Sequence, residues 1–390
     1  MIDYSKVFNS TVENMKPSGI RRFFDIAATM EGVISLGVGE PDFQTPWHIR
    51  KAGITSLERG KTKYTSNSGL MPLREEISRY AQRKYGVKYN PESEILISVG
   101  GSEAIDNVIR AITEGGDEVI IPQPSYVCYE PMVALAGGKP VIIETKAEND
   151  FKLTPEALKA AITPKTKALI LPYPCNPTGA IMEKEDLEKI AEVLKDTNII
   201  VISDEIYAEL TFGKPHTSFA SIDGMWERTV LINGFSKTFS MTGWRLGYAC
   251  GPKELIKNAT KIHQYAIMCA PTTAQYAAIE ALKNGDEAVE NMKKEYDRRR
   301  KLMVSSFNEI GMTCREPKGA FYTFPSIAVS GMSSDEFCEK LLMEEKVALV
   351  PGTAFGKGGE GFIRASYCYS TEHIIEAIER TGRFLRKLGK

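Results

Sequence analysis

The chain has 390 residues, 43% of them apolar and 25% charged, so it is long enough for one large domain and a smaller one. Its formal net charge of -1, with acids and bases mixed along the chain, argues against nucleic acid or an anionic membrane as a partner and favours small molecules. Seven scattered cysteines without a CxxC pair and four separated histidines argue against a disulfide framework or a metal site. We find no signal peptide and no apolar run of ~20 residues, and therefore expect a cytoplasmic protein.

Short apolar runs rich in Ile and Val alternate with amphipathic stretches between residues 95 and 250. Such runs are typical of strands buried on both faces of a parallel sheet. The predicted strands span residues 95–99, 118–121, 141–144, 168–171, 199–203, 230–232 and 246–249. With helices predicted over residues 102–113, 154–162 and 184–194, this pattern indicates an α/β fold with a mainly parallel seven-stranded sheet and helices on both faces.

A different pattern follows residue 285 and predicts a smaller α+β domain. A long charged helix is predicted over residues 285–310, and later helices over residues 334–345 and 371–388. Short strand-like segments lie between them at residues 319–325, 347–350 and 361–367. We expect a large domain over residues 46–290 and a small domain formed by residues 1–45 and 291–390.

Polar residues follow five of the predicted strands at the point where each strand ends. In a parallel sheet these ends lie along one edge, where ligands bind. The segments are residues 100–104, 124–126, 174–179, 203–207 and 234–237. The sequence therefore predicts that their side chains face one site.

The segment Gly100-Gly101-Ser102 lies between a predicted strand and a predicted helix. Backbone N–H groups at a helix N-terminus bind phosphate, so this segment is a candidate phosphate loop. A tight turn with Ser102 as the helix N-cap is the alternative. The absence of GxGxxG counts against a dinucleotide.

Three side chains of the other strand ends suit an aromatic cofactor. Asp204 ends a buried strand and has the charge to pair with a cationic ring nitrogen, although a strand-end Asp is also a common cap or turn residue. Tyr207, three residues on, has a phenol that reaches the same ligand or simply packs. Asn176, in the turn sequence Asn-Pro-Thr-Gly, carries an amide that can donate to a ring oxygen.

Lys237 is the most informative residue of the chain. It follows a buried strand and precedes an aromatic Gly-Trp-Arg segment, so we expect partial burial, a lowered pKa and a nucleophilic amine. Arg245, eight residues later, and Ser236 are placed to bind the same phosphate as the glycine-rich loop.

Arg364 lies in a segment that alternates like a strand and has apolar neighbours. A buried guanidinium needs a partner. That partner is either a carboxylate ligand, bound in a bidentate fork, or an acidic side chain of the protein.

In combination, these residues resemble the fold type I, class I/II pyridoxal-phosphate aminotransferases, specifically the aspartate and aromatic aminotransferase branch of bacteria and archaea. The resemblance covers nearly the whole chain. Its carriers, in chain order, are residues 35–43, Tyr64 before residues 68–70, Gly101-Ser102, Tyr126, residues 176–179, residues 204–207, Ser236-Lys237 through Arg245, and Arg364.

The resemblance implies that Lys237 carries pyridoxal 5'-phosphate as an internal Schiff base and later acts as general acid and base. Asp204 would keep the pyridine nitrogen protonated, which the electron-sink chemistry of this cofactor requires. Asn176 and Tyr207 would bond the ring hydroxyl oxygen. Tyr126 would stack on the ring, where many relatives have Trp.

The same resemblance assigns the remaining contacts. The cofactor phosphate would be held by Gly101, Ser102, Ser236 and Arg245. Tyr64 would reach the phosphate bound by the neighbouring subunit, which implies a homodimer with shared active sites. The substrate α-carboxylate would be held by three residues, namely Gly39, Asn176 and Arg364.

The implied function is amino transfer between an L-amino acid and a 2-oxo acid such as 2-oxoglutarate, by a ping-pong cycle in amino-acid metabolism. Other enzymes on this scaffold remain alternatives, above all a C-S β-lyase, because they share the cofactor residues. Arg364 disfavours α-decarboxylation. A DNA-binding regulator needs a basic module that this chain lacks, and a cofactor-free scaffold is the last alternative.

For the substrate, we expect aspartate first and aromatic amino acids second, with an N-acetyl-diaminopimelate substrate as a third possibility. A dicarboxylate needs a second cation for its distal carboxylate. Arg110 and the segment Ile20-Arg21-Arg22-Phe23-Phe24 both offer one, although exposed helix charges are the alternative for Arg110.

Overall fold

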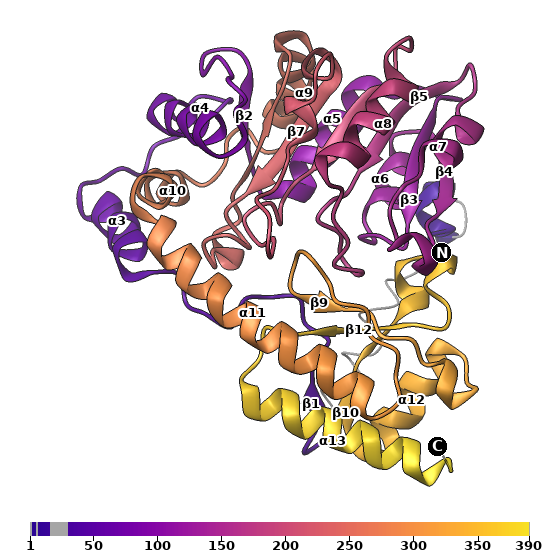
Figure 1. The fold of residues 1–390 in the computed structure, drawn as a ribbon. Coiled ribbons are helices and arrows are strands. Elements are labelled where there is room, and N and C mark those ends of the chain that lie inside the picture. Colours follow the sequence, from indigo (N-terminus) through magenta and orange to yellow (C-terminus); the bar gives the residue numbers. More distant parts are fainter. Residues whose placement is uncertain (1, 5–6, 16–29, 390) are drawn as a thin grey trace.

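The computed structural model describes residues 2–4, 7–15 and 30–389. Seven strands form one sheet in the order β2-β8-β7-β6-β5-β3-β4 (Figure 1). Their bounds are β2 (Ile95–Ser98), β3 (Glu118–Gln123), β4 (Lys139–Glu144), β5 (Thr166–Leu171), β6 (Ile200–Asp204), β7 (Thr229–Gly234) and β8 (Gly247–Cys250). The predicted α/β fold with a mainly parallel seven-stranded sheet is confirmed.

All strands of this sheet except β8 run in the same direction. Strand β8 pairs antiparallel with both of its neighbours, β2 and β7. Strands β4, β3, β5, β6 and β7 pair parallel in series. The carboxyl ends of β2, β3, β5, β6 and β7 therefore lie along one edge of the sheet, as the site prediction requires.

Helices cover both faces because successive strand side chains point to opposite faces. In β5, Ala168 and Ile170 join an apolar cluster with helix α5 (Gly101–Ile112), while Leu169 and Leu171 join a second cluster with α8 (Lys184–Leu194). The remaining helices near the sheet are α3 (Trp47–Glu58), α4 (Met71–Tyr85), α6 (Tyr129–Leu135), α7 (Pro155–Ala161), α9 (Lys253–Ala266) and α10 (Thr272–Asn284).

A smaller α+β unit lies beside the edge where the strands end (Figure 1). Its strands are β1 (Ile34–Ser35) paired with β10 (Val347–Ala348), and β11 (Val350–Pro351), β12 (Ile363–Ser366) and β9 (Tyr322–Thr323) in that order. Its helices are α11 (Asp286–Glu309), α12 (Ser334–Glu345) and α13 (Thr371–Lys387). The predicted division at residue 290 falls inside the first turns of α11, and these domain boundaries stay a prediction.

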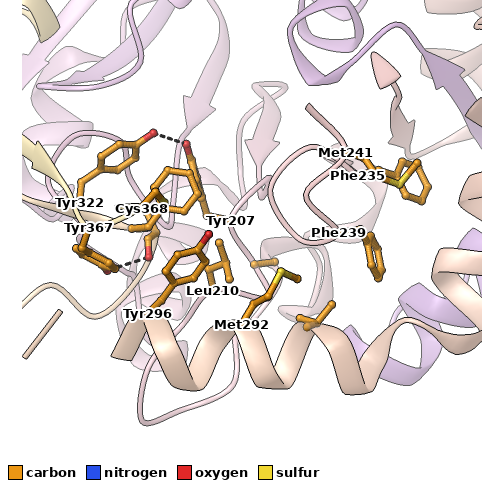
Figure 2. Close-up of a cluster of buried hydrophobic side chains, with 14 of the residues drawn as sticks. Tyr207, Leu210, Phe235, Phe239, Met241, Met292, Tyr296, Tyr322, Tyr367 and Cys368 are labelled. Carbon is orange, nitrogen blue, oxygen red and sulfur yellow. Dashed lines mark hydrogen bonds between the residues drawn. The ribbon is translucent and has the colours of Figure 1, made fainter. Parts of the chain in front are cut away.

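One continuous apolar cluster joins the two units. Figure 2 shows Tyr207, which follows strand β6, near Tyr296 of α11 and Tyr322 of β9, while Phe235, which follows β7, lies farther along the same cluster beside Met241 and Phe239. Aromatic contacts continue this core, with Tyr207 and Tyr322 ring centroids 5.9 Å apart. The small unit is therefore held against the end of the sheet by buried aromatic packing.

Within the described residues, no helix is both long and apolar enough to cross a membrane.

Candidate active site

A cavity of about 310 Å³ lies at the edge of the sheet where the strands end. Strand ends form its floor, and residues 37–39 and strand β12 of the small unit complete it. All but one of the predicted site residues line it, namely Gly39, Gly101, Ser102, Tyr126, Asn176, Asp204, Tyr207, Ser236, Lys237, Arg245 and Arg364. The structure thus brings together residues that are up to several hundred positions apart in sequence.

Lys237 follows β7 and points its amine into this cavity. Its Nζ donates a hydrogen bond to the carbonyl oxygen of Gly39 at 2.7 Å. Burial lowers the pKa of Lys237 to about 8, and the guanidinium groups of Arg364 and Arg245 act in the same direction. At pH 7 about a tenth of this amine is therefore the free base, which is the nucleophilic form, compared with well under a thousandth for an ordinary lysine.

Asp204 is the last residue of β6 and is only 6% exposed. Its Oδ2 accepts a hydrogen bond from the hydroxyl of Tyr129 at 2.7 Å, and its Oδ1 accepts one from the N–H of Ile206 at 3.2 Å. Both partners are neutral, and burial raises the pKa of Asp204. A cationic ligand that faces Asp204 would offset this cost.

The N-terminus of α5 forms part of the cavity wall. Gly100 is the N-cap, with φ 83° and no side-chain cap, so the expected alternative of Ser102 as N-cap is wrong. Ser102 instead lies in the first turn, where it lines the cavity beside uncapped backbone N–H groups. Only glycine fits at Gly247, because a Cβ there would lie 2.5 Å from the carbonyl carbon of Gly100.

Arg245 approaches this helix N-terminus from the other side. A Cβ at Gly100 would lie 2.7 Å from Nη2 of Arg245, so the guanidinium is in close contact with the loop. Arg245 also donates from Nη1 to the carbonyl oxygen of Thr242 at 2.9 Å. With Ser236 on the same wall, this end of the cavity is suited to an anion such as phosphate.

Arg364 lies in β12 and is 3% exposed. Its Nη1 donates to Oδ1 of Asn176 at 2.9 Å, and its Nη2 donates to the carbonyl oxygen of Gly37. Its guanidinium lies between the rings of Tyr322 and Phe355, at 4.4 and 4.8 Å from their centroids. All these partners are neutral, so within the described part of the chain the alternative of an ion pair with a protein acid is not formed.

Two predicted aromatic residues take different positions in the cavity. Tyr207 is buried, and its hydroxyl lies 2.8 Å from the hydroxyl of Tyr322. Tyr126 is 36% exposed, and its ring meets Tyr129 edge-on with centroids 5.8 Å apart. Its exposed position at the mouth leaves a ring available to stack on a planar ligand.

Two other predicted contributors, Tyr64 and Arg110, do not line this cavity. Tyr64 is 82% exposed and does not line the cavity of its own chain. Arg110 is exposed at the far end of α5, where its Nε donates to Oδ2 of Asp106 at 2.8 Å, so it does not reach a ligand in this cavity. Arg21 and Arg22 lie outside the described residues.

Sequence reasoning missed Tyr129 and Tyr322, which both line the cavity. Tyr129 is three residues after Tyr126, a spacing that places the two near one another at the start of α6. Tyr322 lies in a segment predicted as a strand, where an alternating aromatic residue is usually part of the core.

The cavity fits pyridoxal 5'-phosphate on chemical grounds. It offers an anion site at the α5 N-terminus, an amine at Lys237 and a buried carboxylate at Asp204 whose described partners are neutral. A phosphate, an aldehyde and a ring cation complement these three features. Arg364 then remains for a further carboxylate.

Comparisons with known proteins show the family of this chain. The family described as Aminotransferase class I and II matches residues 31–380. The Bacillus subtilis (strain 168) protein YugH, whose name gives an aminotransferase without a substrate, is 57% identical over 96% of this chain and 97% of its own. An aspartate aminotransferase of Pyrococcus abyssi is 49% identical, with 96% of this chain and 97% of its own covered. The solved structure of an aromatic aminotransferase from Pyrococcus horikoshii OT3 has a TM-score of 0.90 and 47% identity, over 94% of this chain and all of its own.

The lowered pKa of Lys237 is directly measurable. We expect the cofactor-free protein to react with a small aldehyde at Lys237 with a rate that is half-maximal near pH 8, because only the free amine attacks. The pH dependence is followed by borohydride trapping and peptide mass mapping, and Lys237→Arg should remove the labelled peptide. A midpoint near the ordinary lysine value of 10.5 would contradict the burial argument.

Proposed function

This chain belongs to the class I and II aminotransferase family and is a pyridoxal-phosphate-dependent transaminase, and from that premise we propose how its residues share the reaction. The proposed reaction moves an amino group between an L-amino acid and a 2-oxo acid such as 2-oxoglutarate. One observation carries the proposal: Asp204 and Arg364 are both buried, are held by neutral partners, and line the same cavity as the Lys237 amine.

The cofactor, when bound, withdraws electrons from the substrate α-carbon through its protonated ring. Asp204 keeps the proton on the ring nitrogen, and Asn176 and Tyr207 hold the ring hydroxyl oxygen. Lys237 supplies the amine that holds the aldehyde, and it then acts as general base and acid at the substrate α-carbon. Gly101, Ser102, Ser236 and Arg245 hold the phosphate, and Tyr126 covers the ring.

Arg364 and the backbone at Gly39 hold the substrate α-carboxylate. Arg364 is buried, lines the cavity and is already oriented by its hydrogen bond to Asn176. Binding a carboxylate therefore costs little side-chain conformational entropy. Holding this carboxylate retains it in the product, which favours transamination over decarboxylation.

The substrate side chain meets a cavity whose only cations, among the described lining residues, are Lys237, Arg245 and Arg364. The proposal already assigns Lys237 and Arg245 to the cofactor and Arg364 to the α-carboxylate, which every amino-acid substrate has. We therefore propose that the described lining accepts an aromatic or other uncharged side chain, and that a preference for aspartate depends on Arg22.

We also propose that the chain works as a homodimer with shared sites. Apolar side chains are exposed on α3 and near the end of α9, including Trp47 at 59% and Tyr265 at 87%. The segment around Tyr64 adjoins the end of α9, since Nδ2 of Asn67 donates to the carbonyl oxygen of Met268 at 2.8 Å. A second copy would cover this surface and bring Tyr64 to its phosphate site.

Replacing Lys237 by Ala tests the reaction assignment. We expect Lys237→Ala to bind pyridoxal phosphate through the phosphate contacts, but to lose transamination by several orders of magnitude, since the base at the α-carbon is gone. Product analysis of single-turnover reactions measures the loss. Substantial turnover would reject the role of Lys237, and ammonia release by the unchanged protein without a 2-oxo acid would indicate β-elimination instead.

Two arginine variants test the substrate side chain. Arg22→Met should raise KM for aspartate and 2-oxoglutarate about tenfold or more while leaving phenylalanine unchanged, if Arg22 binds the distal carboxylate. Arg110→Met is the matched control and should change neither, because Arg110 pairs with Asp106 away from the cavity. Equal effects on all substrates would reject the role of Arg22, and no activity with any dicarboxylate would reject aspartate as a substrate.

Mixed dimers test the shared site. Tyr64→Ala should bind cofactor weakly and Lys237→Ala should be inactive, each as a homodimer. A heterodimer of the two variants should regain activity at limiting cofactor, because one of its two sites then has both an intact Lys237 and the partner's intact Tyr64. If mixing restores nothing, Tyr64 does not act across the interface.

A further inference from the structure

Tyr322 connects the parts of the site that the proposed function assigns to cofactor and to substrate. It belongs to β9 of the small unit and is 1% exposed. Figure 2 shows its hydroxyl meeting that of Tyr207, which belongs to the loop after β6. Its ring faces the guanidinium of Arg364, and a Cβ at Gly39 would collide with its hydroxyl.

The hydrogen bond between the hydroxyls of Tyr207 and Tyr322 has a defined donor once a ligand is bound. Burial raises the pKa of both phenols, so each is neutral and carries one proton. If Tyr207 donates its proton to the ring oxygen of the cofactor, its own oxygen can accept the remaining hydrogen bond. Tyr322 must then be the donor in the 2.8 Å contact with Tyr207.

This direction affects the charge of the cofactor oxygen. A hydroxyl that accepts a hydrogen bond becomes a better donor, because chains of hydrogen bonds polarise one another. A stronger donation from Tyr207 stabilises negative charge on the ring oxygen and lowers the pKa of the cofactor chromophore.

The ring of Tyr322 has a separate effect on Arg364. The guanidinium lies 4.4 Å from the Tyr322 centroid and 4.8 Å from that of Phe355, so it is clamped between two aromatic faces. Its Nε has no hydrogen-bond partner among the described residues. The two rings therefore restrict the plane in which Arg364 presents its N–H groups to a carboxylate.

We propose that Tyr322 is a positioning residue with two separable parts: its hydroxyl directs the proton of Tyr207 toward the cofactor oxygen, and its ring holds Arg364 for the substrate carboxylate. The inference rests on the proposed function and adds a residue that belongs to neither the cofactor set nor the carboxylate set predicted from sequence. It also explains how the small unit contributes to the electronics of a cofactor bound by the large one.

The hydroxyl is tested with Tyr322→Phe, which keeps the ring. The pH titration of the visible absorbance of the holoenzyme should move upward by about 0.5 to 1 unit, as expected for the loss of one hydrogen bond. Tyr207→Phe should move it further, and Tyr322→Phe should add nothing in the Tyr207→Phe background, because Tyr322 acts through Tyr207. Additive shifts, or no shift in Tyr322→Phe, would overturn this part.

Tyr367→Phe is the matched control. Tyr367 is buried in the same aromatic cluster and donates to the carbonyl oxygen of Ala320 at 3.0 Å, but it does not line the cavity. The variant should lower the unfolding temperature as Tyr322→Phe does, yet leave the absorbance titration unchanged. An equal upward shift in Tyr367→Phe would show a general packing effect and overturn the proposal.

The ring is tested with Tyr322→Leu and three carboxylates that lack an amino group: acetate, succinate and 3-phenylpropanoate. Their dissociation constants, measured from the absorbance change, should stay near wild type in Tyr322→Phe and rise about three- to tenfold in Tyr322→Leu. Unchanged binding in Tyr322→Leu would overturn the ring's role. A wild-type protein without a pH-sensitive visible band would instead reject the proposed function, and this inference with it.

Discussion

The site depends on two buried charges that the described protein leaves without a charged partner. Asp204 and Arg364 are 6% and 3% exposed, and each is held by neutral groups only. Burying such charges costs several kcal/mol per ion, so the fold tolerates them only where hydrogen bonds and a ligand compensate. In the proposed function, a cofactor ring cation and a substrate carboxylate would supply the missing charges. The fold therefore loses stability at the two residues whose buried charges binding and chemistry require.

The architecture makes this arrangement by bringing two units to one cavity. Parallel strands align the ends of β6 and β7, and so place Asp204 and Lys237 side by side at one edge of the sheet. The small unit adds Arg364 from β12 and the Gly39 carbonyl oxygen that accepts from Lys237. Tyr322 contacts both Arg364 and Gly39. Aromatic packing between the units therefore fixes the position of Arg364 relative to Asp204 and Lys237.

Much of this could be predicted from sequence because the chemistry follows buried strands. Each of the seven predicted strands is present, with each end within two residues of the prediction, because short runs of Ile and Val are typical of strands buried in a sheet.

Helices α3, α4, α9 and α10 were not predicted. In α3 the reason is physical: apolar residues such as Trp47 and Leu57 are exposed, which blurs the helical pattern. Ser102 was interpreted as a possible N-cap because sequence spacing does not show which residue starts a helix. Tyr322 resembled a core residue because the partner of its hydroxyl, Tyr207, is distant in sequence.

Relatives named for aspartate and for aromatic amino acids resemble this chain about equally, at 49% and 47% identity, so overall similarity does not distinguish the two substrate classes. The cavity's described cations are Lys237, Arg245 and Arg364, and the proposed function assigns all three to the part of the reaction that every amino acid shares. The lining that faces the side chain includes Tyr126, Tyr322 and other uncharged groups, which tolerate a ring. A distal carboxylate then requires a cation from outside this lining. The choice between the two substrate classes would thus turn on a single added charge, while the scaffold and its cofactor site stay the same.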